Sequence, residues 1–324
     1  MLRFLITTAA LLLIVGVFWL FEEDLPAQEV DGRYSNEASG FLTTASGARV
    51  HFRDQGQPGG VPLVLVHGAN ASLHTWEPWV RELGDTYRVV TMDLPGHGLT
   101  GQVPDGDYSR SAQMETVQAV LDHLAVERFV LGGNSMGGGV AWRYALEQPG
   151  QVAALILVDA SPPRNWREPS SEEPAGRTPI AFRLLEQPWF RAVARYVDPA
   201  VLVEQGLRAA YNDADVVDDE LIARYRDLAL REGSREAILS GFGQPRAETG
   251  SAADPASITA PTLILWGARD TLIDVRYAER FHAAIADSRL VVYPELGHVP
   301  MEEAPQRTAA DVREFLQAEV AADL

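Results

Sequence analysis

The sequence has no cysteine among its 324 residues. This absence excludes disulfides, thiolate nucleophiles, metal sites with cysteine ligands and lipid attachment through a cysteine. It does not exclude an oxidising compartment, because a chain of this length buries enough apolar surface to fold without disulfides. Any nucleophilic chemistry must therefore come from another side chain.

Positive charge is also scarce. The chain carries 27 Lys+Arg against 45 Asp+Glu, a formal net charge of −18, and its pI is near 4.8. Nucleic-acid binding needs clusters of basic residues, and none stands out here, so we expect no nucleic-acid partner. The hydrophobic fraction of 46% is that of a globular protein and predicts one large domain or two modest ones.

The N-terminus contains the longest apolar run. From Phe4 to Phe21, 18 residues carry no charge, and as a helix they would cover about 27 Å of a bilayer core of ~30 Å. A cleaved signal peptide has a shorter apolar stretch and a small-residue cleavage site, and it is the alternative. With Arg3 before the run and acidic residues after it, we expect residues 1–21 to be an uncleaved single-pass anchor and the rest of the chain to be exported to a periplasmic or extracellular location.

The remaining chain alternates short apolar runs with helical patterns. Residues 22–40 are polar with scattered Gly and Pro and predict a linker. The alternation predicts a mostly parallel sheet covered by helices on both faces. The expected strands are Val50–Arg53, Leu63–Val66, Tyr87–Met92, Phe129–Leu131, Ala154–Val158, Thr262–Trp266 and Leu290–Tyr293.

One region interrupts this alternation. Residues 161–255 contain no convincing strand, and they begin with a stretch rich in Pro, Ser and charge. We expect a helical cap there, inserted between two parts of one core, residues 41–160 and 256–324. The expected cap helices are Ile180–Leu185, Trp189–Tyr196, Ala200–Ala210 and Glu220–Leu230.

The strongest local signal is Gly133-Asn134-Ser135-Met136-Gly137, directly after an expected strand and before a helical pattern. A Gly-x-Ser-x-Gly sequence in that context predicts a nucleophile elbow, a sharp turn that presents the serine oxygen at the head of a helix. A glycine-rich phosphate loop is excluded because no Gly-Lys-Ser/Thr follows. We therefore predict that Ser135 is the nucleophile.

A serine nucleophile needs a base and an acid that orients it. His298 follows the last expected strand and Asp270 the preceding one, so both lie at the carboxyl ends of parallel strands. The chain order Ser135, Asp270, His298 is the order found with this elbow. Asp159, after the strand Ala154–Val158, is the rival acid.

Stabilisation of an oxyanion requires two N–H donors. We expect the backbone N–H of Met136 and that of Ala69, in the loop after an early strand, with the Asn70 side chain as a further candidate. His67 and His97 are expected to shape loops. The sequence shows no His-Glu-x-x-His metal motif, and we expect neither a metal nor another cofactor.

With these motifs the chain resembles the α/β-hydrolase fold family over residues 40–320. The resemblance implies an eight-stranded, mostly parallel sheet flanked by helices, with residues 161–255 as the helical cap, and the triad Ser135, Asp270 and His298. The motifs that carry it are His67-Gly68, Asp93-Leu94-Pro95-Gly96-His97-Gly98, Gly133-Asn134-Ser135-Met136-Gly137-Gly138, Trp266-Gly267-Ala268-Arg269-Asp270 and Gly297-His298.

The predicted activity is hydrolysis of carboxylic esters with apolar acyl groups, and the substrate is a small molecule. The elbow is similar to that of hydrolases that cleave carbon–carbon bonds, so carbon–carbon or amide hydrolysis by the same triad is the alternative. A non-catalytic binding protein on this fold is the alternative of another class. Apolar cap side chains suggest the acyl pocket: Trp189, Phe190, Tyr196, Leu202 and Leu207.

Overall fold

The computed structural model describes residues 21–166, 184, 187–243 and 253–320. The expected anchor lies outside these ranges except for Phe21, and so does most of the expected helix Ile180–Leu185. Within the described ranges, no helix is both long and apolar enough to cross a bilayer.

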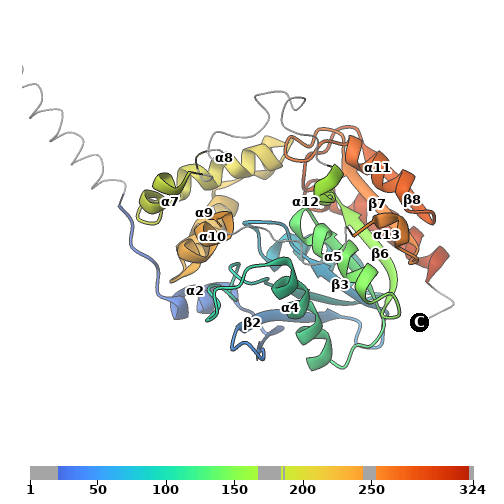
Figure 1. Cartoon of the computed structure of the whole chain (residues 1–324), viewed down its shortest axis with the longest axis horizontal. Helices are drawn as coiled ribbons and strands as arrows, with labels where there is room; N and C mark the ends of the chain where they lie inside the picture. Colours follow the sequence, from blue (N-terminus) through green and yellow to red (C-terminus); the bar gives the residue numbers. More distant parts are fainter. Residues whose placement is uncertain (1–20, 167–183, 185–186, 244–252, 321–324) are drawn as a thin grey trace, which may run out of the picture.

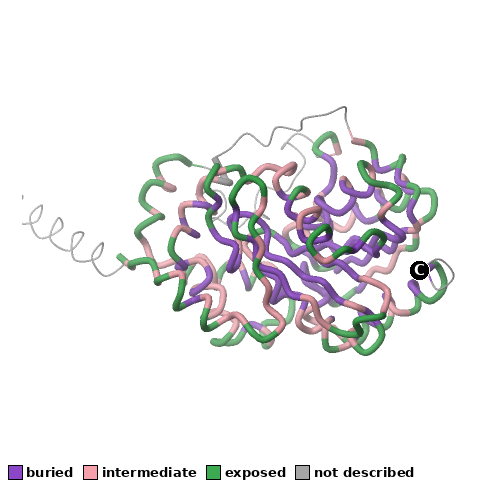
Figure 2. The backbone as a smooth tube through the Cα atoms, turned by 90° about the horizontal axis from the view of Figure 1, so that it is seen from below, coloured by how far each residue is buried: buried purple, intermediate pink, exposed green. Residues whose placement is uncertain are grey.

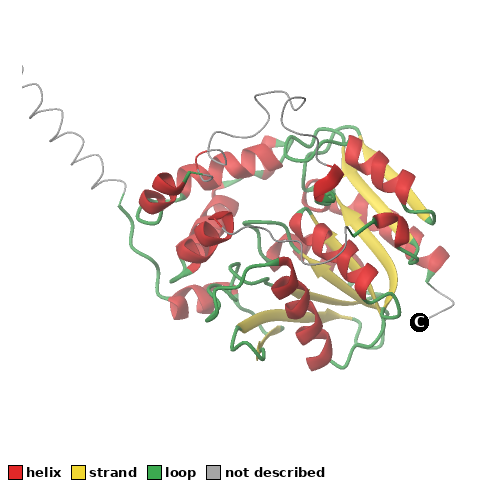
Figure 3. Cartoon of the chain, in the orientation of Figure 1, coloured by secondary structure: helices red, strands yellow, loops and turns green. Residues whose placement is uncertain are grey.

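An eight-stranded sheet forms the centre of the molecule (Figure 3). Its strand order is β1-β2-β4-β3-β5-β6-β7-β8. Strands β3 to β8 run parallel, whereas β1 and β2 are antiparallel to their neighbours. The predicted mostly parallel sheet is therefore confirmed. The strands are β1 Ser39–Thr43, β2 Arg49–Gly56, β3 Pro62–Val66, β4 Arg88–Met92, β5 Phe129–Asn134, β6 Val152–Val158, β7 Thr262–Gly267 and β8 Ser288–Tyr293.

Both faces of the sheet are covered, so its central strands are buried (Figure 2). Successive residues of a strand point to opposite faces. In β3, Val64 and Val66 join one apolar cluster, and Leu63 and Leu65 join the other. This is why β3 reads as a continuous apolar run rather than an alternating one.

Helices from three parts of the chain cover the two faces. Helices α4 (Arg110–His123), α5 (Met136–Glu147) and α11 (Arg276–Ala284) contribute to the first cluster. Helices α3 (Glu77–Leu83) and α13 (Pro305–Glu319) contribute to the second. The two short helices η1 (Leu73–Trp76) and α12 (Pro300–Glu303) contact each other beside the ends of the strands.

The described residues between β6 and β7 form helices joined by loops, and helices α7 to α10 gather beside one end of the core (Figure 1). Helix α8 matches the expected range, and α10 was not predicted because its apolar residues give little periodicity. The elements are η2 (Arg164–Trp166), α7 (Pro188–Ala194), α8 (Ala200–Ala210), η3 (Ala214–Val216), α9 (Asp219–Leu230), α10 (Ser234–Gly243) and η4 (Pro255–Ser257).

Residues 22–40 differ from the predicted linker. They contain helix α2 (Ala27–Tyr34), in which Val30 is fully buried against Leu99 of the core and Leu228 of the cap. The polar residues that suggested a linker make ion pairs instead, such as that of Asp31 with Arg231. Local sequence does not show these partners because they lie about 200 positions further along the chain.

Candidate active site

The elbow at Ser135 has the backbone that the motif predicts. Ser135 has φ 53° and ψ −115° and joins strand β5 to helix α5. A Cβ at Gly133 would lie 2.3 Å from the Gly137 carbonyl oxygen, and one at Gly137 would lie 2.2 Å from the Val66 oxygen. The glycines are therefore required by close backbone approach, and the strained serine stands at the N-terminus of a helix.

His298 and Asp270 form a buried pair. The Nδ1–H of His298 donates to Asp270 Oδ2 at 2.7 Å, and both residues are buried. The other carboxylate oxygen, Oδ1, accepts the backbone N–H groups of Leu272 and Ile273 at 2.7 and 3.0 Å. This arrangement fixes the carboxylate and the tautomer of the imidazole, leaving Nε2 of His298 as the basic nitrogen.

Asn134 links the elbow to the loop of His298. Its Nδ2 donates to the His298 backbone oxygen at 3.0 Å and to the Val158 oxygen at 3.2 Å. The residue immediately before Ser135 therefore holds the backbone of His298. The sequence contained this residue inside the elbow motif, but no spacing rule pointed to its partner, which is 164 positions away.

Two backbone N–H groups next to Ser135 lack a partner. In the described part of the chain, the N–H groups of Ala69 and Met136 donate to no acceptor. Ala69 follows Gly68, where an added Cβ would lie 3.2 Å from the Ser135 Cβ, so this loop approaches the serine. Unpaired donors beside a nucleophile are the groups that stabilise an oxyanion.

Asp159, the rival acid, lies beside the pair without taking its place. Polar atoms of Asp159, Asp270 and His298 all lie within 4.8 Å of one another. Asp159 Oδ1 accepts the N–H of Gly267 at 3.1 Å, and its Oδ2 is buried beside Asp270. Burial, together with the neighbouring Asp270, raises the pKa of Asp159 well above its usual range, so we expect it to be neutral.

This trio is a poor metal site. A metal ligand must be deprotonated, but Nδ1 of His298 uses its proton in the bond to Asp270 and Asp159 holds its own. We therefore assign no metal ion to Asp159, Asp270 and His298.

His67 and His97 lie in loops, as the sequence predicted. His67 Nδ1–H donates to the Gly68 oxygen at 2.7 Å, and its Nε2 accepts the Leu94 N–H at 3.0 Å. His97 Nδ1–H donates to the Pro95 oxygen at 2.9 Å, and burial lowers its pKa to about 4. Both rings therefore fix loop backbone on the strand ends around the elbow.

Glu303 holds the core and the cap together. Its Oε1 accepts the N–H of Gly297 at 2.7 Å, and its Oε2 accepts those of Asn212 and Asp213 at 2.8 and 2.9 Å. Just before these residues, Ala210 at the end of α8 accepts the N–H of His298 at 2.7 Å. No sequence pattern assigned Glu303 a role, because its partners Asn212 and Asp213 lie about 90 positions away.

Glu302 is a second carboxyl at the contact between core and cap. Thr75 Oγ1 donates to it, and the buried hydroxyl of the cap residue Tyr211 lies beside it. Burial raises the pKa of Glu302 to about 7, against the opposing effects of Thr75 and Arg224. The carboxyl therefore titrates near neutrality.

The residues expected to form the acyl pocket differ in how far they are exposed to solvent. Leu207 is 4% exposed and packs in the second apolar cluster. In contrast, Trp189 and Tyr196 are 63% and 52% exposed, so the prediction that they form a buried pocket is wrong. Trp189 on α7 and Tyr196 in the turn after it face solvent. The apolar periodicity predicts an apolar face but does not show what covers it.

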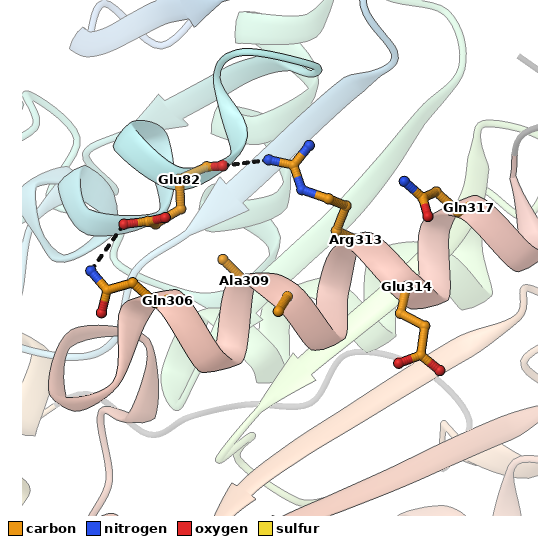
Figure 4. Close-up of a pocket in the computed structure, with 7 residues that line it drawn as sticks. Glu82, Gln306, Ala309, Arg313, Glu314 and Gln317 are labelled. Carbon is orange, nitrogen blue, oxygen red and sulfur yellow. Dashed lines mark hydrogen bonds between the residues drawn. The ribbon is translucent and has the colours of Figure 1, made fainter.

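A surface hollow lies elsewhere, between helices α3 and α13 (Figure 4). Gln306 Nε2 donates to Glu82 Oε1 at 3.0 Å, and Arg313 Nη2 donates to the Glu82 backbone oxygen at 2.5 Å. The hollow includes none of the residues around Ser135, and Gln306 and Arg313 in its lining both bond Glu82. We therefore assign it no part in the chemistry.

Known proteins are similar to this chain in sequence and in fold. The profile of the family described as "alpha/beta hydrolase fold" matches residues 61–305. A 2-hydroxymuconate semialdehyde hydrolase of Pseudomonas sp. (strain CF600) is 29% identical over 86% of this chain and 94% of its own. Lipase 1 of Psychrobacter immobilis is 26% identical over 85% of this chain and 82% of its own.

Among solved structures, a membrane phospholipase A described as a bacterial virulence factor is 26% identical with a TM-score of 0.71. The match covers 98% of this chain and 99% of that one. These relatives share a fold and hydrolytic names but differ in the bond that their names specify.

Proposed function

Because the chain belongs to the α/β-hydrolase fold family, we propose that it is a serine hydrolase that cleaves carboxylic esters of apolar acyl groups. The observation that carries the proposal is the elbow serine at φ 53° next to unpaired N–H groups, with a buried His298–Asp270 pair linked to it through Asn134. In this proposal Ser135, His298 and Asp270 form the triad.

In the first half of the reaction, Ser135 Oγ attacks the ester carbonyl carbon while Nε2 of His298 takes the hydroxyl proton. Asp270 stabilises the imidazolium that forms, and the N–H groups of Met136 and Ala69 bind the oxyanion. The carbon–oxygen bond to the alcohol then breaks, and the alcohol leaves with the proton from His298.

In the second half, water attacks the acyl-enzyme. His298 takes a proton from the water, the tetrahedral intermediate collapses, and Ser135 Oγ leaves with that proton. The products are one carboxylic acid and one alcohol, and the enzyme returns to its starting state.

Ester hydrolysis is supported by the names of two relatives, a lipase and a membrane phospholipase A. The oxyanion loop, His67-Gly68-Ala69-Asn70, differs from the glycine- and proline-rich loop expected for carbon–carbon hydrolases. Carbon–carbon hydrolysis is the second candidate, favoured by Asn134 in the elbow and by the 2-hydroxymuconate semialdehyde hydrolase relative. A panel of nitrophenyl esters, amides and ring-fission dienones separates them, and faster turnover of dienones than of esters contradicts the proposal.

The remaining alternative is a binding protein with an idle triad. A fluorophosphonate probe tests it, because the probe bonds covalently to an activated serine. We expect labelling of the wild type and none of Ser135→Ala. Absence of labelling in well-folded wild-type protein contradicts the enzyme proposal.

We further propose that residues 4–21 anchor the protein in a membrane, with the catalytic domain exported. The apolar sequence of this run supports the proposal, and so does the membrane phospholipase A, whose match extends over 98% of this chain. Separation of cells into membrane and soluble fractions tests it. Recovery of the full chain in the soluble fraction contradicts it.

A further inference from the structure

Most of the exposed large apolar side chains in the described part of the chain belong to the cap or to the segment that enters it. Five of them, 50–63% exposed, lie on the cap helices α7 and α8, in the turn that follows α7 and in the segment that enters the cap. The other one, Phe41, lies on strand β1 beneath the Arg49 guanidinium. We name the five the apolar cap patch: Phe21, Trp189, Val193, Tyr196 and Val201.

The patch continues directly from the N-terminal apolar run. Trp189 and Val193 are four residues apart on α7 and so share a face. Tyr196 follows, and the Phe21 ring stacks on it with centroids 6.2 Å apart. The Glu22 N–H donates to the Tyr196 oxygen at 3.1 Å. The residue at which the apolar run 4–21 ends is therefore part of the patch.

Backbone hydrogen bonds and an ion pair attach the segment after Phe21 to the cap. Leu25 exchanges backbone hydrogen bonds with the end of α9, accepting from Glu232 at 2.9 Å and donating to Leu230 at 2.7 Å. Arg235 pairs with Asp24 at 2.6 Å. Because these bonds allow little movement, a membrane that holds the residues before Phe21 also holds the apolar cap patch at its surface.

We propose that the apolar cap patch docks on the phospholipid surface in which residues 4–21 are anchored. Trp and Tyr rings favour the membrane–water interface, where an apolar body and a polar tip are both accommodated. The net charge of −18 favours a zwitterionic surface over an anionic one. The inference rests on the proposed anchor, and it places α8, whose Ala210 bonds His298, next to the lipid that an esterase of apolar acyl groups would use.

The absence of cysteine permits a direct test with the full chain. We suggest Val193→Cys and Val201→Cys, each labelled with an environment-sensitive fluorophore, in phosphatidylcholine vesicles with and without brominated acyl chains. Gln317→Cys on α13 is the control, because it is exposed and α13 and α7 lie at opposite ends of the molecule (Figure 1). We expect a blue shift and bromine quenching at 193 and 201 and neither at 317.

Other outcomes overturn the inference. Equal emission and no quenching at all three positions means that the patch remains in water. A blue shift of the fluorophores at 193 and 201 without bromine quenching means that protein covers the patch instead of lipid. The covering protein is then a second copy of the chain or residues 4–20. A chain that does not float with the vesicles overturns both the anchor and the docking.

Turnover of a nitrophenyl ester in the same samples separates this inference from the proposed function. Turnover without quenching contradicts docking alone. Quenching without turnover supports docking and contradicts the hydrolase.

Discussion

The core and the cap contribute differently to the loop that carries His298 and the residues that follow it. In the core, Asp270 follows β7 and His298 follows β8, and the buried parallel strands fix where each loop starts. The cap contributes the carbonyl of Ala210 to His298 and the N–H groups of Asn212 and Asp213 to Glu303. Under the proposed function, the core supplies the reacting groups, whereas the cap holds the base His298 in place through a few polar bonds.

The largest effect should come from the acid of the core. Asp270→Asn favours the wrong imidazole tautomer, and we expect kcat for a nitrophenyl ester to fall by about 10⁴-fold. Asp159→Asn is the matched control, because the wild-type side chain is already neutral there, and it should keep kcat close to that of the wild type. The reverse order of the two losses would show that Asp159 is the orienting acid.

A smaller effect is expected where the core meets the cap. Glu303→Gln replaces one acceptor oxygen by an NH₂ group that faces backbone N–H donors, so the His298 loop loses its support. We expect kcat to fall by up to about 10²-fold, the scale of a small misplacement of a catalytic group. KM should change less than kcat.

Glu314→Gln provides the comparison for that variant, since Glu314 is 66% exposed and pairs with Arg289 at the surface. We expect it to retain wild-type kcat. Equal losses in the two variants would argue against a positioning role for Glu303.

The contact between core and cap should also respond to pH through Glu302. Its pKa is raised from 4.5 to about 7 in the folded protein, so its contribution to stability is present below pH 4.5 and is lost as pH rises through 7. Glu302→Gln keeps an acceptor for Thr75 but removes this proton linkage.

Relative to the wild type, Glu302→Gln should therefore gain free energy of unfolding between pH 4.5 and 7, by at most about 3 kcal/mol. Urea denaturation at several pH values measures the difference. A difference that is constant with pH would mean that Glu302 is ionised throughout.

The smallest effect should come from the N-terminal segment on the cap. Arg231→Gln removes the ion pair with Asp31 across nearly buried groups and should cost about 1–2 kcal/mol of stability without changing kcat. Arg208→Gln, which breaks an exposed pair with Glu204 on α8, should cost under about 0.5 kcal/mol. Urea denaturation compares the two, and equal costs would show that the segment contributes no more than a surface pair.

The strands were predictable because burial on both faces leaves a continuous apolar run, as in β6, where every residue from Val152 to Val158 is buried. The edge strand β1 was not predicted, because its residues are half-buried or exposed and give no such run. The cap helix α10 was missed for a related reason, since its apolar residues follow no clear helical spacing. Burial on both faces made the central strands predictable, whereas α8 was predicted from its helical spacing although only Leu207 in it is buried.

For the site, the elbow around Ser135 was predictable because it depends on neighbours in sequence. The pairing of His298 with Asp270 followed from the chain order and the shared edge of the sheet. Asn134 and Glu303 were not assigned roles, because an amide or a carboxylate acquires its partner only when distant loops meet.

The alternation of strand and helix, the glycines that permit the turn at Ser135 and the absence of any thiol can all be read from the amino-acid sequence. These are local properties of backbone sterics and apolar periodicity. Only the tertiary structure decided that Asp159 accompanies Asp270, that residues 22–40 are ordered on the cap, and that Trp189 faces solvent. Such outcomes depend on desolvation and on contacts between distant segments, which no local pattern encodes.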